Sequence, residues 1–508
     1  MIMKKILIYT ILLSSLLTAG SCSKDWLDVN TNPNTPTSTT PELIFTNAVN
    51  SYISNLGPHQ FGAHLAGQYT QSTSFIGGGA VLTYAISNTD FNFFTGYYNN
   101  LNDFQYVIEN STEANQHLAG FSRVMKALIF HRLVDLYGDI PYTDALKGTR
   151  VLQPKYDDDK FIFEDLIKVL DTAISVIKSS TVTTDASDIV FGGDKTGWIR
   201  FANTLKLRIL MRQSYIPGRD AYIVPEINRI ISEGTGFLEA GMDVTASPGY
   251  IAGSAGKINP VFATYGYDQN FAQSQGVRLI KLTSTVIDQL KNTDDTFRLK
   301  RVAHPKGGPG AVKVTSNYVG IPTGASGNQF LESLTSSVGP ALVDVTTDAT
   351  GKVTGGNQTK RVVIMLAAES FLNRAEAKQR FPAVSLPLTA QQYYEQGVRE
   401  SFRINGATDA QATLLLTGLK ANADFNVSPD KITAIMTQKW LAFLNYDGLE
   451  AWSEQRKSEI PPVPISLQAA TPTRPVRLFY PLVEESSNAV NTPDNINIFT
   501  SKVFWDVN

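Results

Sequence analysis

Amphipathic helices that recur along most of the chain are the sequence feature that most limits its fold. Residues 121–137 carry apolar side chains on more than one face, and apolar residues recur at steps of three and four from residue 163 to residue 174. The same spacing returns at residues 432–444, and residues 362–381 are predicted to form another helix. Apolar stripes of this kind must be buried against neighbouring helices. The sequence therefore predicts a mostly α-helical fold in which paired helices form a repeat-like scaffold.

A glycine-rich segment interrupts the helices. Residues 234–356 hold 18 of the 37 glycines of the chain, show little helical periodicity apart from residues 284–290, and include short β-like runs such as residues 312–314. We predict an irregular, partly β lobe at residues 234–356, inserted between an N-terminal helical scaffold (42–233) and a C-terminal helical scaffold with an irregular tail (357–508). Loops on a rigid scaffold often carry function, so this lobe is the candidate ligand-binding region.

The N-terminal segment has the layout of a bacterial export signal. Two lysines are followed by an apolar run at residues 6–17 and by small residues that end at Cys22, the only cysteine of the chain. The apolar run is too short for a bilayer, which takes about 20 residues. We predict that residues 1–21 are removed and that Cys22 becomes a lipid-modified N-terminus, because a lone cysteine in an exported chain needs a reason. A plain secretory signal is the alternative, since Ala19 stands where lipoboxes usually hold leucine.

The segment that follows Cys22 is predicted to be a flexible tether. Residues 22–41 are rich in Asn, Thr and Pro, which favour turns and extended backbone. Residues 28–39 begin like a calcium-binding EF-hand loop, but Pro33 replaces the required glycine and Thr39 replaces the final glutamate. We therefore predict no calcium site in the tether.

Composition excludes some classes of partner. A formal net charge of −2 and a pI of about 6.3 give no electrostatic case for nucleic acid binding. Charged residues make up 18% and aromatic residues 10% of the chain, which fits an exported protein that handles uncharged, ring-shaped or polar ligands. The alternative is that most of the aromatic residues form a large core.

Motifs for catalysis or for metal binding are missing from the sequence. It has no HExxH motif, His59 and His64 are five positions apart rather than four, and a single cysteine excludes thiolate metal sites. No spacing of carboxylates singles out the acid pair that a glycosidase needs. We predict that the chain is not an enzyme and uses neither a cofactor nor a metal.

Six segments, in this order and spacing, resemble the SusD/RagB family of surface nutrient-binding lipoproteins of Bacteroidetes-type bacteria, in its branch described as SusD-like with starch-binding outer-membrane association. The segments are residues 26–34, 136–145, 369–378, 438–443, 450–456 and 477–491. The resemblance implies four tetratricopeptide-like helix pairs with an irregular lobe packed against them. It also implies a lipid-anchored protein of the outer membrane, facing the exterior, whose partner is a SusC-type TonB-dependent transporter. Surface-exposed members usually carry two or more acidic residues after the cysteine, whereas only Asp25 follows closely here.

The charged residues of the helices are interpreted as structural. The helix predicted after Asp194 places Arg200, Arg208 and Arg212 on one face, which we interpret as solvated or salt-bridged rather than as a binding patch. Within the family-like segments we interpret the charged residues as pairs that fix helix register and the tryptophans as core; these residues are Glu369, Arg374, Glu450, Arg456, Trp440 and Trp452.

Ligand binding is expected from exposed aromatic and amide side chains, because a sugar ring offers C–H groups on its face and hydroxyls on its rim. The candidates lie in two glycine-rich stretches: Tyr69, Gln71 and Phe75 in the first, and Tyr250, Asn259, Tyr265, Tyr267, Asp268, Gln269, Asn270 and Phe271 in the second. For each single residue, packing in the core is the alternative. The sequence and the resemblance together predict a non-catalytic protein that captures oligosaccharides for the transporter. Capture of oligopeptides, or a mainly structural lid that gates the transporter, are the alternatives.

Overall fold

A computed structural model of the chain describes residues 39–75 and 79–508, and Pro41–Asn508 form one compact unit. Cys22, the predicted signal at residues 1–21 and nearly all of the predicted tether lie outside the described residues. The helices of the first part are α2 (Pro41–Ser54), α3 (Gly57–Leu65), α4 (Gly79–Thr83), α5 (Phe93–Asn110), α6 (Gln116–Tyr137), α7 (Asp159–Ser179), α8 (Lys195–Arg212) and α9 (Asp220–Glu233).

The glycine-rich segment contains only short helices, and longer ones resume after it. The short helices are α10 (Pro260–Tyr265), α11 (Gln275–Leu279), α12 (Ser284–Asn292) and α13 (Thr296–Val302). The later helices are α14 (Ala367–Arg380), α15 (Ala390–Ile404), α16 (Asp409–Leu416), α17 (Lys431–Phe443), α18 (Gly448–Ser458) and α19 (Leu482–Ser487).

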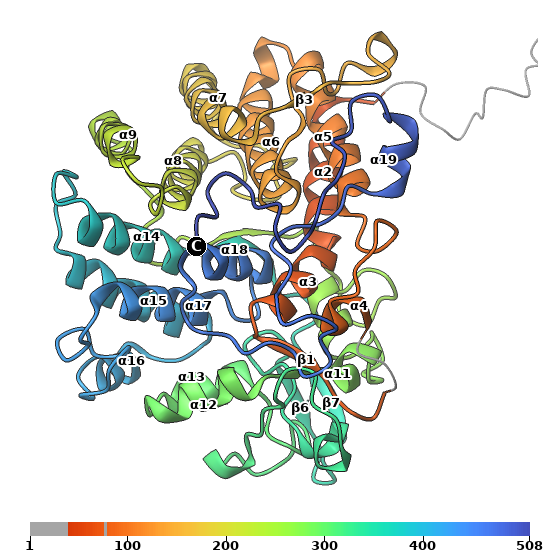
Figure 1. Cartoon of the computed structure of the whole chain (residues 1–508), viewed down its shortest axis with the longest axis vertical. Helices are drawn as coiled ribbons and strands as arrows, with labels where there is room; N and C mark the ends of the chain where they lie inside the picture. Colours follow the sequence, from red (N-terminus) through yellow and green to blue (C-terminus); the bar gives the residue numbers. More distant parts are fainter. Residues whose placement is uncertain (1–38, 76–78) are drawn as a thin grey trace, which may run out of the picture. The chain divides into compact units, whose positions relative to one another are not determined.

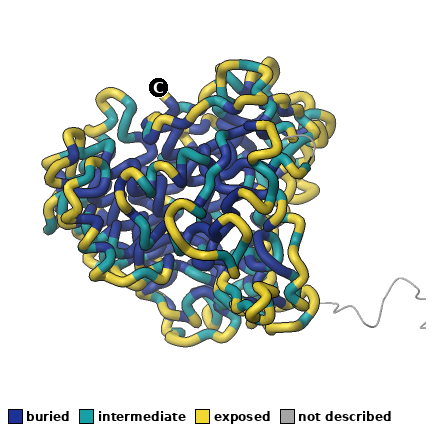
Figure 2. Tube along the Cα trace, turned by 90° about the horizontal axis from the view of Figure 1, so that it is seen from below, coloured by how far each residue is buried: buried dark blue, intermediate teal, exposed yellow. Residues whose placement is uncertain are grey.

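Helices from the two ends of the chain form one continuous array (Figure 1). Helices α5, α6, α7 and α8 pack in succession, α8 packs against α14, and α14 packs against both α15 and α17. Helix α17 then packs against α18, which returns to α3 near the N-terminus of the described chain. The loop-rich lobe is therefore an excursion between two parts of a single helical array. Figure 2 shows the buried residues running through the interior of this unit, with most exposed residues on its loops.

Local signals in the sequence set the helix boundaries. The side chain of Asp158 caps the N-terminus of α7 by accepting a hydrogen bond from the Phe161 amide, and Asp194 caps α8 in the same way. Helix α6 ends at Gly138, whose φ of 72° is readily adopted only by glycine. The helix predicted after Asp194 is confirmed by α8.

The strands form four separate antiparallel pairs. They are β1 (Tyr69–Gln71) with β5 (Ile280–Leu282), β2 (Ile140–Pro141) with β3 (Tyr156–Asp157), β4 (Val244–Ala246) with β8 (Val362–Met365), and β6 (Val345–Thr347) with β7 (Val353–Gly356). The first and third pairs join the lobe to the scaffold, because one strand of each pair lies outside residues 234–356.

Two sequence predictions about strands are wrong. Residues 362–365 form β8 rather than the first turn of a helix, and α14 begins only at Ala367. The run of Val362, Val363 and Ile364 is β-branched and favours an extended strand once a partner strand is available. Conversely, residues 312–314 form no strand, and Val312 is 68% exposed, since no partner strand lies beside it.

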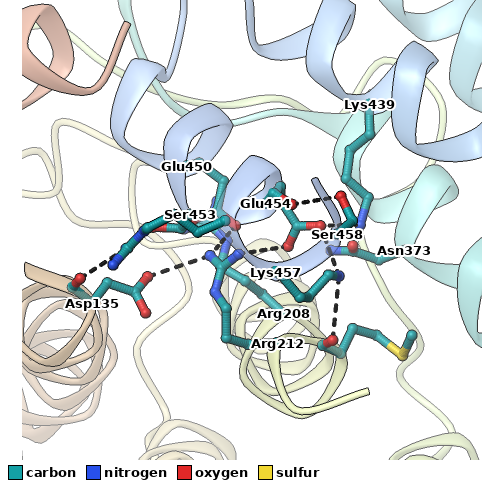
Figure 3. Close-up of polar contacts among 12 residues, drawn as sticks. Asp135, Arg208, Arg212, Asn373, Lys439, Glu450, Ser453, Glu454, Lys457 and Ser458 are labelled. Atoms are coloured by element: carbon teal, nitrogen blue, oxygen red, sulfur yellow. Dashed lines mark hydrogen bonds and ion pairs between the residues drawn. The ribbon is translucent and has the colours of Figure 1, made fainter. Parts of the chain in front are cut away.

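A network of buried ion pairs holds the helical array together (Figure 3). Arg212 of α8 lies 2.6 Å from the Glu454 carboxylate and also pairs with Glu450, both on α18. Lys439 of α17 lies 2.7 Å from Glu376 of α14 and 2.9 Å from Glu454. None of these side chains is more than 4% exposed. The network therefore ties α8, α14, α17 and α18 together in a water-poor interior.

Among the described residues, ion pairs are found for Glu369, Glu450 and Arg374 but not for Arg456, and those of Glu369 and Glu450 are more deeply buried than a surface pattern suggests. Arg208 forms a bidentate pair with Glu369 through two contacts of 2.6 Å, and both side chains are 1% exposed. Arg374 pairs with Glu239 at 2.9 Å, whereas Arg456 donates to main-chain carbonyls. Trp440 and Trp452 are core residues, as predicted. The alternative that Arg208 and Arg212 face solvent is wrong, because α14 and α18 cover that side of α8.

The first prediction concerns the buried network. Lys439→Met leaves Glu376 and Glu454 with fewer cationic partners in the interior, so we expect it to lower the free energy of unfolding by about 3–5 kcal/mol. Denaturant-induced unfolding measures this change. Lys168→Met is the matched control, because Lys168 is 72% exposed and lies 3.6 Å from Asp165, where a loss of at most about 1 kcal/mol is expected. Equal effects of the two substitutions would show that the buried network does not stabilise the fold.

Candidate functional site

A pocket lies at the seam between the helical array and the loop-rich lobe, and we call it the seam pocket. Helices α2 and α3 and the turn between them form one wall, while α10 and β8 form the opposite wall. The space within it that water molecules can occupy has a volume of about 80 Å³. In the same measure about 10–15 Å³ holds one water molecule, so the pocket has room for several waters or for one small polar group.

Both aromatic and polar side chains line the seam pocket. Its aromatic residues are Tyr52, Tyr97, Tyr265 and Tyr446, which come from α2, α5, α10 and the loop before α18. Amide side chains are supplied by Asn55, Asn259 and Asn445. Tyr52 and Tyr446 are half-buried and Asn55 is exposed, so these residues lie toward solvent. Tyrosines and amides around one concave space are the combination expected for a ligand with apolar faces and hydroxyl edges.

A buried ion pair lines the inner part of the pocket. Arg132 of α6 donates two hydrogen bonds to Asp447, of 2.7 and 3.1 Å. Burial alone would raise the pKa of Asp447, but Arg132, with Arg208 behind it, lowers that pKa to about 2. Asp447 also caps α18 by accepting a hydrogen bond from the Glu450 amide. The carboxylate is therefore ionised and held in place by the same helices that carry the buried network.

His59 supplies a hydrogen-bond donor to the pocket wall. The amide of Gly448 donates to its Nδ1 at 2.8 Å, so the neutral ring carries its proton on Nε2, and that buried atom has no hydrogen-bond partner in the described structure. Burial lowers the pKa of His59 to about 4, which keeps the ring neutral at physiological pH. The contact with Gly448 depends on close packing of α3 and α18, where a Cβ atom on Gly62 would lie 2.4 Å from the Gly448 carbonyl oxygen.

The structure brings the two predicted binding stretches together, but largely in the core. Tyr69 and Tyr265 lie 5.9 Å apart between ring centroids, and both rings pack against His59. They are 0% and 1% exposed, so the expected open faces are absent, and only Tyr265 lines the seam pocket. Asn259 also lines the pocket, and its side chain caps α10 by accepting from the Val261 and Phe262 amides.

Residues 267–271 form a tight loop rather than an exposed aromatic platform. Tyr267 is 2% exposed and pairs with Gln273 through a β-bridge, which places its ring in the core. Asp268 accepts hydrogen bonds from the amides of Asn270 and Ala272, so its carboxylate holds the turn together.

The other candidates in this stretch are partly accessible. Asn270 is exposed, Gln269 is half-buried, and Phe271 is half-buried against the core with a φ of 63°. Tyr250 lines a second hollow. This hollow is formed by residues of α2 that neighbour those of the seam pocket in sequence, and by residues within 248–260. None of these four residues lines the seam pocket.

The remaining candidates lie elsewhere in the lobe. Gln71 ends β1, and Phe75 lies with its ring centroid 5.4 Å from the guanidinium of Arg278. Arg278 pairs with Glu332 at 2.9 Å and, with Lys281, lines a hollow of about 160 Å³. Neither Gln71 nor Phe75 lines the seam pocket.

Sequence reasoning missed most of the residues that form the seam pocket. Tyr52, His59 and Arg132 come from the first helices, whereas Tyr446 and Asp447 lie near the end of the chain. No local pattern links residues so far apart. The available signal was the run of residues 445–448 between two family-like segments, to which we assigned no role from the sequence alone.

Two groups of side chains are close enough together to be considered for a metal ion. Asp139, Asp158 and Asp159 lie within 4.8 Å of one another, but all three accept hydrogen bonds from main-chain amides or cap a helix. The other group is His131, Asp135 and Glu450, which lies inside the buried network, where Arg212 pairs with both carboxylates. Both groups are accounted for by structural roles.

Among the described residues, no helix is both long enough and apolar enough to cross a membrane.

Comparisons with known proteins give one family. A family model described as starch-binding and associating with the outer membrane matches residues 33–481. Similar solved structures include a SusD homologue from Bacteroides fragilis, with 21% identity, coverage of 92% of this chain and 99% of that chain, and a TM-score of 0.71. A chitin-binding SusD homologue from Flavobacterium johnsoniae has 21% identity, coverage of 91% and 99%, and a TM-score of 0.73. No functionally curated protein matches significantly. The expected mostly α-helical, tetratricopeptide-like fold is confirmed.

The second prediction concerns His59. Its pKa is about 4 in the folded chain and about 6.5 when unfolded, so the unfolded state binds more protons as pH falls from 6.5 toward 4. Stability contributed by the neutral ring is therefore lost in this range. We expect the free energy of unfolding of the wild type, relative to His59→Gln, to fall by about 2 kcal/mol between pH 7 and pH 5. Urea titrations of both proteins measure the difference, and a difference that is constant with pH would contradict the assignment.

Proposed function

Because this chain belongs to the SusD-like family of starch-binding proteins that associate with the outer membrane, we propose that it captures oligosaccharides outside the cell without altering them and delivers them to a SusC-type TonB-dependent transporter. The family match supports glycan binding and outer-membrane association in general. Delivery to a transporter, lipid anchoring at Cys22 and orientation toward the exterior are our extensions of it.

The observation that carries the proposal is the lining of the seam pocket. Tyr52 and Tyr446 are far apart in the sequence, but their half-buried rings both line one concave space. The exposed Asn55 lines the same space. Tyrosine rings bury the C–H face of a sugar, and amide groups hydrogen-bond its hydroxyls. The walls belong to α2 and to the loop that caps α18, which the helical array holds in fixed positions.

The carboxylates of the pocket support a binding role rather than glycoside hydrolysis. Among the described residues that line the pocket, Asp447 is the one carboxylate, and it is fully engaged with Arg132 and the N-terminus of α18. Glycoside hydrolysis needs two carboxyl groups on either side of the scissile bond, one of them protonated. Asp447, with a pKa of about 2, supplies neither a proton donor nor a partner acid.

Oligopeptide capture is the alternative within the binding class, and a mainly structural lid is the alternative outside it. Screening the purified domain, residues 41–508, against arrays of polysaccharides and peptides separates all three. Binding to glycans supports the proposal, binding to peptides alone favours the second ligand class, and binding to neither, with transporter association intact, favours the lid.

The third prediction tests whether the seam pocket is the glycan site. Tyr52→Ala removes a half-buried ring from the pocket wall, so we expect at least about a tenfold loss of affinity for any glycan identified by the array. Isothermal titration calorimetry measures the loss. Tyr222→Ala is the matched control, since Tyr222 is a half-buried tyrosine on α9, stacked under Arg219 at 4.1 Å and outside the pocket. Equal affinities of the two variants and the wild type would exclude the seam pocket as the site.

The fourth prediction tests the lipid anchor. Cys22→Ala removes the sulfur that would carry the lipid, and the sequence has no other cysteine that could take its place. We expect the variant to leave the membrane fraction and to appear in a soluble fraction, while its thermal unfolding temperature stays unchanged. Fractionation of cells that express each version, followed by immunoblotting, measures the distribution. A variant that still sediments with outer membranes would overturn the anchor but not the fold.

A further inference from the structure

We propose that the seam pocket recognises an acidic oligosaccharide, in which the carboxylate of a uronic acid residue is bound beside Lys360. This inference rests on the proposed function and names the ligand class of the same site. Low overall charge and many aromatic residues suggested uncharged ligands, whereas the local charges of the pocket favour a negative one.

Among the described residues that line the pocket, the positive charges outnumber the negative ones. Arg132, Lys360 and Arg361 are cationic, and Asp447 is the one carboxylate among the described lining residues. Asp447 is already paired with Arg132. Arg361 is directed to structural acceptors, because its guanidinium donates to the Thr245 hydroxyl and to three main-chain carbonyls at 2.6–2.9 Å. The lining cations without an ion-pair partner among the described residues are therefore Lys360 and Arg361, and of the two it is Lys360 that lies beside an aromatic ring of the pocket, that of Tyr446.

Lys360 is held at the pocket without an anionic partner. Its ammonium donates to the carbonyl of Ala341 and lies 5.8 Å from the ring centroid of Tyr446, and it forms no ion pair with any described residue. Two carboxylates act on it from a distance, but Asp344 is paired with Arg301 and Asp243 is paired with Arg403. An ammonium group has three protons, so it retains donors for a ligand after the bond to Ala341.

His59 lines the same space and carries a second donor without a partner among the described residues. The Nε2–H of His59 is buried and has no acceptor within the described structure, and the ring stays neutral because Gly448 holds its other nitrogen as an acceptor. A carboxylate offers about four acceptor sites and can accept from both a lysine and an imidazole. The volume of about 80 Å³ that water molecules can occupy suits one such group with bound water, while the rest of the ligand extends past Tyr52 and Asn55.

A uronic acid fits these observations better than a peptide carboxylate. Its carboxylate is attached to a pyranose ring, and the half-buried Tyr52 and Tyr446 rings lie around the same pocket. The flat C–H face of the sugar can therefore pack on a tyrosine while the carboxylate reaches Lys360. A peptide terminus brings no such flat ring to the aromatic walls.

The test compares an acidic oligosaccharide with its methyl ester, which keeps the sugar skeleton and removes the charge. Oligogalacturonate and its fully methyl-esterified form share one skeleton, and maltohexaose, oligoalginate, hyaluronan oligosaccharides and trialanine complete the panel. We expect at least one acidic oligosaccharide to bind about tenfold tighter than its neutral counterpart in calorimetry at low salt, and this preference to shrink at 0.5 M NaCl. Lys360→Met should abolish the preference without reducing affinity for a neutral oligosaccharide.

Two variants control for folding and for general charge. Lys360→Arg keeps the positive charge and should retain most of the preference, which distinguishes a charge effect from a folding defect. Lys352→Met removes the same charge from an exposed position just before β7 and should leave the preference unchanged. A preference lost equally in Lys352→Met would overturn the assignment to Lys360.

The outcomes separate the inference from the proposed function. Neutral oligosaccharides that bind at least as tightly as every acidic one would overturn the inference and leave glycan capture intact. If trialanine binds in a manner that depends on Lys360 and no acidic sugar binds, the inferred ligand is wrong and a peptide carboxylate takes its place. If no oligosaccharide on the panel or on the array binds, the proposed function is overturned, and the inference with it.

Discussion

The buried ion pairs of the helical array are the interaction on which the rest of the structure depends. Arg212, Lys439 and Glu454 meet where α8, α17 and α18 converge, and none of them is more than 4% exposed. Charges in such an interior are costly unless every one is paired, so a helix displaced by one turn would leave an ion without a partner. We infer that the network fixes the register of the helices more than it adds net stability. Apolar stripes bring the helices together, and the ion pairs select one arrangement among several.

The same network reaches the seam pocket. Arg208 is bound to Glu369 within the array and lies 4.0 Å from Asp447, which in turn holds Arg132 at the pocket. The polar groups of the site are thus the outer members of an interior cluster, fixed before any ligand arrives. A binding site held in this way loses little conformational entropy on binding, which favours affinity from few contacts.

The sequence was sufficient for the parts of the structure that local patterns determine. The capping aspartates before α7 and α8 and the glycine after α6 define their helix ends without reference to the rest of the chain. Prediction failed where a partner distant in sequence decides the outcome. Residues 362–365 form a strand because β4 lies beside them, and Tyr265 is buried because Tyr69 and His59 pack on it. The seam pocket combines both ends of the chain, so no local window contains it.

The return of α18 to the first helices has a consequence for when this chain can fold. Arg208 and Arg212 belong to α8, but most of their carboxylate partners, Glu369, Glu450 and Glu454, are made much later. Until those residues exist, Arg208 lacks these partners, and the described N-terminal helices offer Arg212 only Asp135 of α6. Residues 41–233 therefore cannot complete their packing during synthesis. For a chain that is exported as we propose, this delay keeps the polypeptide open for passage through a translocation channel and postpones folding until the far side has been reached.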